Sequence, residues 1–135
     1  MQVGRRLTAV TTAAPTYSGE PMYTEKPIVD LRIYTIRLRR MAEFLDVFDR
    51  LAMPVQLKYL GRPLGMFTSA VGTLNQVVHL WEFDSMGEFE ARHAARDKDP
   101  EWPAYLSASA DLIIAQENRF LRRADLPSLS TMRST

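Results

Sequence analysis

The 135-residue chain contains no cysteine and only two histidines, His79 and His93, and these shortages exclude several kinds of site. Without cysteine there is no disulfide, thiolate metal site, iron–sulfur cluster or cysteine nucleophile. Two imidazoles are few for a zinc site, so we predict no metal site and no other cofactor. The sequence also lacks a G-x-G-x-x-G, Walker or G-x-S-x-G motif. We therefore expect function to depend on a shaped pocket, a partner surface, or both.

Neither an excess of one charge nor a long apolar run is present. Lys and Arg number 17 against 16 Asp and Glu, a formal net charge of +1. A protein that neutralises many phosphates normally has a basic surplus. No apolar run approaches the roughly 20 residues that cross a bilayer. We predict no nucleic-acid partner and no membrane span, and the 46% hydrophobic content suits one globular domain.

The two ends of the chain differ in composition from the middle. Residues 1–20 are rich in Thr, Ala, Ser and Gly and contain no acid before Glu20. We predict a disordered N-terminal extension over residues 1–27, a folded domain over 28–123 and a disordered tail over 124–135. The expected location is the cytoplasm. The alternatives are a mitochondrial transit segment over residues 1–21, or a natural start at Met22.

Hydrophobic periodicity predicts strands and helices in alternation. Strict alternation predicts a strand over residues 28–36, and steps of three and four predict a helix from about 41 to 59 that Pro54 can kink. Further strands are expected over residues 64–71, 76–83 and 112–121. A capping box formed by Ser85 and Glu88 begins a helix that ends near Arg96, and a second helical piece starts at Asp99.

The resulting β-α-β-β-α-β order predicts an α+β fold of the ferredoxin-like type, with an antiparallel sheet and helices on one face. The first and third strands lie side by side at its centre. We expect their more aliphatic face to pack beneath the helices. The opposite face is large and mixed in character, and we expect it to meet a second copy in a homodimer. That second face carries Arg32, Tyr34, His79 and Trp81.

Four segments of the folded region together resemble the NIPSNAP family. They are D-L-R-I-Y-T at 30–35, L-G-R-P-L-G at 60–65, L-N-Q-V-V-H-L-W at 74–81, and D-P-E-W at 99–102 with Tyr105 and Leu106 after it. The resemblance covers residues 28–122 in order. It implies a ferredoxin-like subunit that pairs sheet to sheet into a dimeric α/β barrel. Related barrels include cofactor-independent monooxygenases, haem-degrading enzymes and isomerases, so the resemblance leaves the reaction open.

The mixed face provides the candidate site. His79 is the candidate catalytic residue, because an imidazole can act as a general base near neutral pH. Trp81 is positioned to stack on a flat ligand, and Arg32 to pair with its charge. Tyr34 and Asn75 are candidates for orienting the same ligand, which would be anionic or phenolic.

A structural role is the alternative for these residues. In that interpretation His79 and Trp81 are hydrogen-bonded interior or interface residues, and Arg32 pairs with Asp30 or Glu117. A structural histidine is also expected at His93. Residues 88–99 alternate in charge and suggest a solvated helix face, which includes Arg96. We expect Trp102 and Tyr105 to anchor a helix to the core.

Two functions follow from these alternatives. The first is a NIPSNAP-like homo-oligomer of poorly defined role that binds a small molecule or a protein partner without turnover. The second is a cofactor-independent monooxygenase or isomerase that acts on a small aromatic or quinol-type substrate. Whether the protein is an enzyme is left open by the sequence. A cavity of roughly 300 Å³ or more in contact with His79 would favour the enzyme.

Overall fold

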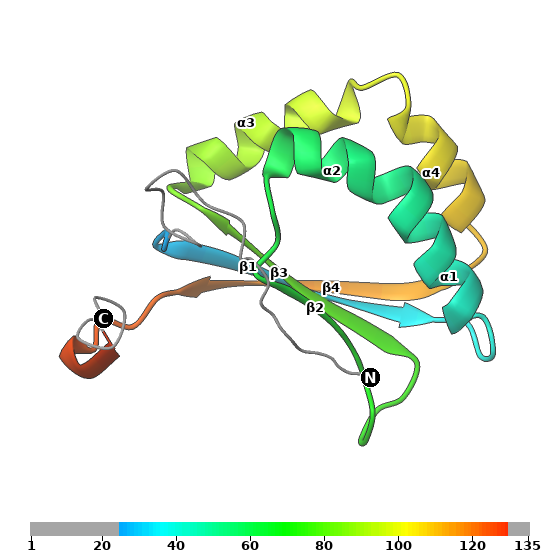
Figure 1. The fold of residues 1–135 in the computed structure, drawn as a ribbon, viewed down its shortest axis with the longest axis horizontal. Coiled ribbons are helices and arrows are strands. Elements are labelled where there is room, and N and C mark those ends of the chain that lie inside the picture. Colours follow the sequence, from blue (N-terminus) through cyan, green and yellow to red (C-terminus); the bar gives the residue numbers. More distant parts are fainter. Residues whose placement is uncertain (1–24, 130–135) are drawn as a thin grey trace, which may run out of the picture.

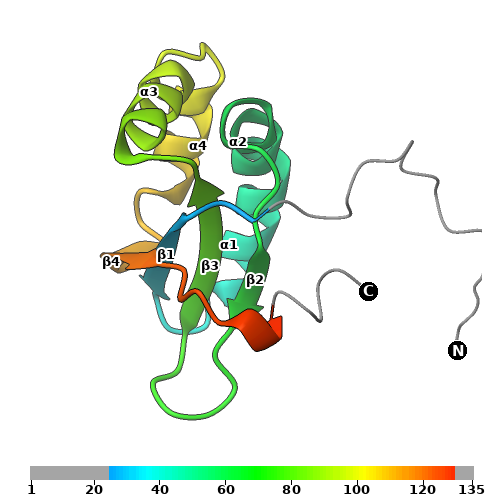
Figure 2. The same ribbon diagram turned by 90° about the vertical axis from the view of Figure 1, so that its left-hand side faces the viewer.

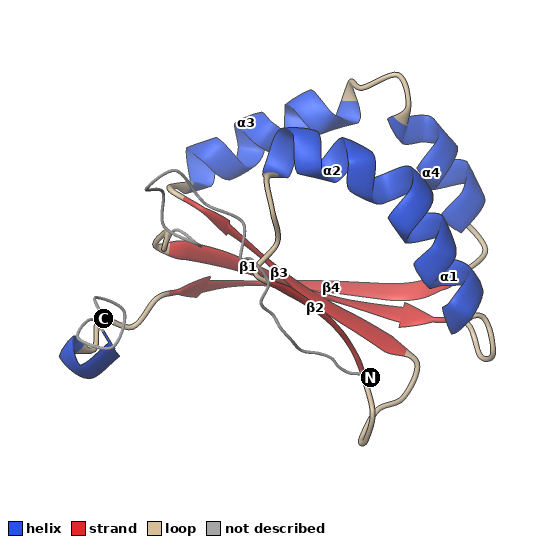
Figure 3. Ribbon diagram, in the orientation of Figure 1, coloured by secondary structure: helices blue, strands red, loops and turns tan. Residues whose placement is uncertain are grey.

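A four-stranded antiparallel sheet, with its strands in the order β2-β3-β1-β4, forms the centre of the fold (Figure 1). The computed structural model describes residues 25–129. Its elements are β1 (Ile28–Ile36), α1 (Met41–Val47), η2 (Phe48–Ala52), α2 (Met53–Leu60), β2 (Gly65–Thr68), β3 (Gln76–Phe83), α3 (Met86–Asp97), α4 (Trp102–Ser109) and β4 (Ile113–Arg122). The labelled helices all lie on one side of the sheet (Figures 2 and 3). The predicted α+β, ferredoxin-like fold is confirmed.

The predicted extension and tail lie mostly outside the described residues. Residues 1–24 and 130–135 are not described, so the predicted disorder of both segments stays a prediction. Near the end of the described part, residues 127–129 form one helical turn. No helix among residues 25–129 has both the length and the apolarity that crossing a membrane requires.

The register of the central strands decides which side chains meet. In the β1–β3 pair, Arg32 lies opposite His79 and Asp30 lies opposite Trp81. On its other side β1 pairs with β4, where Asn118 lies opposite Arg32. Because side chains of directly opposed residues point to the same face of a sheet, these five residues share one face.

The first helical stretch accommodates Pro54 through a wider turn rather than a break. Proline has no backbone N–H, so a regular helix would lose one hydrogen bond there. The chain instead forms the π-helical segment η2, and the N–H of Met53 bonds to the carbonyl of Phe48, five residues earlier. The stretch therefore continues to Leu60, where Gly61 ends it with a φ of 81°.

The second helical region is split at Asp99, as the sequence indicates. Ser85 caps α3, and its hydroxyl accepts a hydrogen bond from the Glu88 N–H at 3.0 Å. The Glu88 carboxylate accepts from the N–H of Asp84 at 2.6 Å, one residue earlier than in the usual capping box. The Asp99 carboxylate accepts from the Glu101 N–H at 2.8 Å, which fixes the turn that leads into α4.

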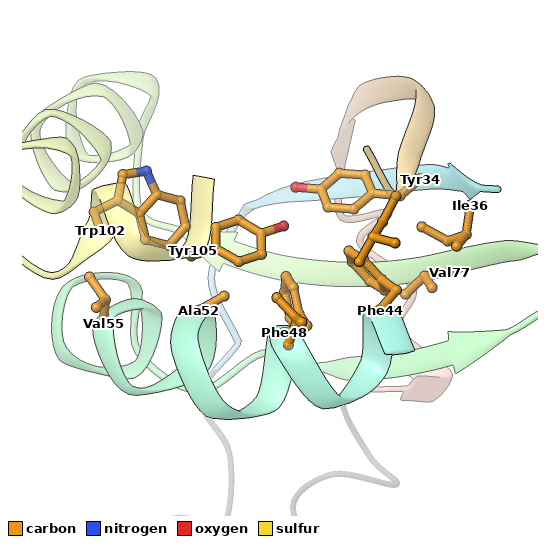
Figure 4. Packing of buried hydrophobic residues seen from close by; sticks show 11 residues of the cluster. Tyr34, Ile36, Phe44, Phe48, Ala52, Val55, Val77, Trp102 and Tyr105 are labelled. Atoms are coloured by element: carbon orange, nitrogen blue, oxygen red, sulfur yellow. The ribbon is translucent and has the colours of Figure 1, made fainter. Parts of the chain in front are cut away.

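The helices cover the face that the sequence analysis leaves free, and that part of the prediction is wrong. Tyr34 and Val77 of the sheet pack with Phe44 and Phe48 of the first helical stretch and with Tyr105 of α4 (Figure 4). Aromatic rings have the largest apolar surface to bury, so the face that carries Tyr34, Trp81 and Phe83 packs beneath the helices. The half-exposed open face holds the aliphatic residues that were expected inside, namely Leu31, Ile33, Val78 and Leu80.

Candidate functional site

His79 and Trp81 lie in the interior beneath the helices, each only 1% exposed. The indole Nε1–H of Trp81 donates a hydrogen bond to His79 Nδ1 at 2.8 Å. Indole nitrogen is only a donor, so Nδ1 carries no proton and the neutral ring carries its proton on Nε2. Burial, with a further contribution from the Arg32 charge, lowers the pKa of His79 to about 3. His79 is therefore a neutral hydrogen-bond donor at physiological pH and is poorly suited to act as a base.

Arg32 lies in a polar cluster on the same face. Its Nε donates to Asp30 Oδ2 at 2.8 Å, so of the two partners considered above Arg32 pairs with Asp30. Its Nη2 lies 3.0 Å from His93 Nε2, and His93 Nδ1 lies 2.8 Å from the Phe89 carbonyl. The carbonyl needs a donor, which places the His93 proton on Nδ1 and lets Nε2 accept from Arg32.

Burial also changes the titration of the groups in this cluster. Burial raises the pKa of the Asp30 carboxyl, although the adjacent Arg32 charge opposes this shift. Burial is likewise the main cause that lowers the pKa of His93 to about 4. Both histidines are thus held neutral, and Arg32 and Asp30 form a nearly buried ion pair.

A cleft of about 660 Å³ opens between α4, the end of α3 and strands β1 and β4. We call it the α4 cleft. Its polar and aromatic lining comprises Arg32, Tyr34, Arg96, Asp97, Trp102, Tyr105, Ser109 and Gln116. The cleft therefore contacts two of the predicted site residues. His79 and Trp81 are not among its lining residues, and the ring of Tyr34 stands edge-on to His79 at a centroid distance of 4.7 Å.

Two further residues give the α4 cleft a flat wall, where the charge of Arg96 is paired with the Asp97 carboxylate at 3.0 Å. The Arg96 guanidinium lies over the Trp102 ring at 4.3 Å, and its Nη1 donates to Gln56 Oε1 at 2.9 Å. The Arg96 side chain is only 12% exposed, which corrects the prediction of a solvated position. Such an arrangement offers both stacking and charge to a planar ligand.

Tyr105 reaches the α4 cleft from α4 while remaining 4% exposed. Figure 4 shows its hydroxyl and the hydroxyl of Tyr34 pointing toward each other. Ser109 lies near and acts to lower the Tyr105 pKa, but no side chain among residues 25–129 meets hydrogen-bond geometry with this hydroxyl. Burial dominates and raises the pKa of Tyr105, so its hydroxyl stays protonated.

Asn75 does not join the other candidates. It lies in the turn before β3 with a φ of 63°, a conformation that asparagine tolerates better than most residues. Its backbone carbonyl accepts a hydrogen bond from the Ile36 N–H at 2.7 Å. Asn75 is absent from the lining of the α4 cleft, so the structure provides a turn-forming role for it.

Within the described part of the chain, no three His, Cys, Asp or Glu side chains gather as a metal site would require. Sequence reasoning missed Arg96 as a cleft residue and assigned Trp102 and Tyr105 to the core alone. The core assignment is confirmed, because both rings belong to the main hydrophobic cluster. The spacing of Arg96 and Trp102 across the Asp99 turn was the available signal.

Fold and cleft together define a class: a ferredoxin-like α+β subunit with a ligand-sized cleft between its sheet and its helices. The sequence pattern of the NIPSNAP family matches residues 29–127. The chain therefore belongs to the NIPSNAP family.

Individual relatives agree with this assignment. The chain is 32% identical over 81 residues to a protein NipSnap homolog of Dictyostelium discoideum, a match that covers 58% of this chain and 34% of the relative. The chain thus spans about a third of that relative's length. A solved NIPSNAP family protein from Agrobacterium tumefaciens is 34% identical, with a TM-score of 0.70 over 73% of this chain and 93% of that one.

A more distant structure shares the fold alone. A putative antibiotic biosynthesis monooxygenase from Nitrosomonas europaea superimposes with a TM-score of 0.53 at 10% identity, covering 73% of this chain and 99% of that one. At that identity the likeness concerns architecture, and it carries no information about chemistry.

Proposed function

We propose that this NIPSNAP protein is a homo-oligomer whose role is to bind a small, flat, anionic or phenolic molecule in the α4 cleft without turnover. The observation that carries the proposal is the cleft itself, about 660 Å³ in volume and lined by Arg32, Arg96 and Trp102. Pockets for small molecules commonly occupy about 300–1,000 Å³ and combine apolar walls with a few polar groups.

Absence of turnover is proposed because the candidate base is poorly placed. His79 is separated from the α4 cleft by Tyr34, and its Nδ1 already accepts the Trp81 hydrogen bond. To take a proton, the neutral ring would have to break that bond in a buried site. Its pKa of about 3 shows how unfavourable the charged form is there.

Calorimetric titration with 2-naphthoate tests the binding proposal. We expect saturable binding to the wild-type protein. Arg96→Gln should weaken it by about 10-fold or more, because hydrogen bonds to a charged group contribute roughly 1.5–3 kcal/mol. Arg92→Gln is the matched control. Arg92 is on the same helix, but it donates to the Tyr59 carbonyl and to Glu88, away from the cleft.

Two results would count against the binding proposal. Failure of 2-naphthoate and 2-naphthol to bind the wild-type protein would remove its basis. Equal losses of affinity for 2-naphthoate in the Arg96 and Arg92 variants, both checked for folding by circular dichroism, would place the site elsewhere.

The second candidate function is a cofactor-independent monooxygenase or isomerase acting on an aromatic or quinol-type substrate. The size of the α4 cleft and the phenolic groups of Tyr34 and Tyr105 favour it. Oxygen consumption or a new product in the presence of naphthohydroquinone, at a rate above the uncatalysed reaction, would support this function. Loss of that rate in His79→Ala, with the fold intact, would show that His79 takes part in the reaction.

Homodimerisation is proposed through the open face of the sheet. Leu31, Ile33, Val78 and Leu80 are half-exposed there, and Phe67 of β2 is 58% exposed. Along β4 the same face carries Glu117 and Arg119, which pair with each other at 2.6 Å. A two-fold axis would set this mixed strip against itself and match its opposite charges.

Light scattering tests the dimer. We expect a mass of twice the 15.4 kDa chain for the wild-type protein. Leu80→Arg should give a folded monomer, because it places a charge on the open face without touching the core. A wild-type mass of one chain would contradict the proposal.

The proposed location is the cytoplasm, with the mitochondrion as the alternative if residues 1–21 act as a transit segment.

A further inference from the structure

Tyr105 OH and His79 Nε2 are the buried side-chain polar atoms without a hydrogen-bond partner among residues 25–129. Buried polar groups in folded proteins are nearly always paired, so each such atom calls for an explanation. The two residues belong to one ring cluster. Phe48 stands edge-on to His79 at 5.6 Å and to Tyr105 at 5.7 Å between ring centroids.

Tyr105 and Arg32 line this end of the α4 cleft, and His79 lies behind Tyr34. His79 Nε2 carries a proton because Nδ1 accepts from Trp81. Arg32 is a donor only, and the Tyr105 hydroxyl keeps its proton. Because His79 lies behind Tyr34, a ligand in the cleft lies against Tyr105 and Arg32, whose hydroxyl and guanidinium groups can donate to a ligand oxygen.

The two carboxylates nearby already accept hydrogen bonds from arginines. Asp30 accepts from Arg32 at 2.8 Å. Asp97 accepts from Arg96 at 3.0 Å and is turned toward solvent, with its side chain 58% exposed. The Tyr105 hydroxyl is a buried donor that has no partner within residues 25–129, and a ligand oxygen in the cleft can accept from it.

We propose that the α4 cleft selects ligands by a hydrogen-bond-accepting oxygen on a flat ring, such as a quinone or aryl ketone carbonyl, and that the Tyr105 hydroxyl donates to this oxygen. Tyr34, whose hydroxyl points toward that of Tyr105, borders the same position (Figure 4). His79 lies behind Tyr34, and its Nδ1 already accepts from Trp81, so it presents no competing acceptor. This inference rests on the proposed binding function and names its ligand class.

Titration with two probes of the same ring size tests the inference: 1,4-naphthoquinone has acceptor oxygens, and 1-methylnaphthalene has none. The absence of cysteine excludes thiol adducts with the quinone. We expect the quinone to bind the wild-type protein at least about 10-fold more tightly, as one or two new hydrogen bonds would produce. Tyr105→Phe should reduce that preference by about 3- to 10-fold and leave the affinity for 1-methylnaphthalene unchanged.

Tyr59→Phe is the matched control. The Tyr59 hydroxyl donates to Asp99 outside the α4 cleft, so its removal should leave the preference for the quinone intact. Equal affinity of wild-type protein for the two probes would overturn the inference while leaving the binding function in place. An equal loss of both probes in Tyr105→Phe would also overturn it. Failure of both probes and of 2-naphthoate to bind would contradict the binding function itself.

Discussion

The two faces of the sheet differ in a way that reverses the usual association of polar residues with solvent. The covered face holds Asp30 and Arg32 as an ion pair, with His79 buried among aromatic rings. The open face is aliphatic, with Leu31 and Leu80 half-exposed. A buried charge or imidazole is costly unless it is paired. That cost is typical of a site kept for binding, whereas an exposed aliphatic sheet face is typical of a partner surface.

The largest expected difference between the two faces is in how much their ion pairs contribute to the free energy of unfolding. Asp30→Asn removes the partner of the nearly buried Arg32, and we expect it to lower the free energy of unfolding by about 3 kcal/mol. Glu117→Gln breaks the exposed pair with Arg119 on the open face and should change it by less than about 0.5 kcal/mol. Urea unfolding at one fixed protein concentration measures both values. Similar losses in the two variants would remove the distinction between the faces.

The buried imidazole should make the covered face sensitive to acid. His79 stays neutral in the folded protein down to about pH 3, whereas it becomes protonated below about pH 6.5 when unfolded. Its contribution is therefore complete above pH 6.5 and is lost as the pH falls from 6.5 toward 3. Between pH 7 and pH 5 we expect about 2 kcal/mol of stability to be lost through this group.

His79→Gln provides the comparison for that pH dependence. The glutamine side chain cannot titrate, so the unfolding free energy of the variant should fall less between pH 7 and pH 5 than that of the wild-type protein. Urea unfolding at the two pH values gives the difference directly. If the two proteins lose the same amount, His79 is not held neutral by burial.

The smallest expected effect on stability comes from removing an unpaired hydroxyl, and removal of a paired hydroxyl is the comparison. Tyr105→Phe removes a buried hydroxyl that has no partner within the described residues, so stability should stay constant or rise by up to about 1 kcal/mol. Tyr59→Phe removes a 2.8 Å hydrogen bond to Asp99 and should lower stability. Thermal unfolding of the ligand-free variants measures both. A clear loss of stability in Tyr105→Phe would mean that this hydroxyl is already satisfied.

Periodicity and turn chemistry predicted most of the fold because they act locally. The alternation over residues 76–83 matches β3, and Ser85 caps α3 as its spacing indicates. Which face the helices cover is a long-range property. Both faces of β1 and β3 contain enough apolar surface to form a core, so alternation alone does not distinguish them.

The candidate site was predicted only in part, because strand register is local whereas the packing of the helices on the sheet is not. Arg32 and Tyr34 line the α4 cleft, but His79 and Trp81 lie behind it, and Asn75 belongs to a turn. Residues from one strand share a face by register, which the sequence reveals. The contribution of Arg96 depends on how α3 and α4 meet over the sheet. The Asp99 turn indicates that Arg96 and Trp102 are near each other, but no local pattern specifies the angle between the helices.

The central claim is that ligands bind on the covered face of the sheet, in the α4 cleft. Chemical-shift mapping of ¹⁵N-labelled protein with 2-naphthoate tests it most directly, because one experiment observes both faces. We predict that the largest shifts occur at the Trp102 indole and in the backbone around Tyr105. Shifts confined to Leu31, Ile33, Val78 and Leu80 would place the site on the open face and contradict the account.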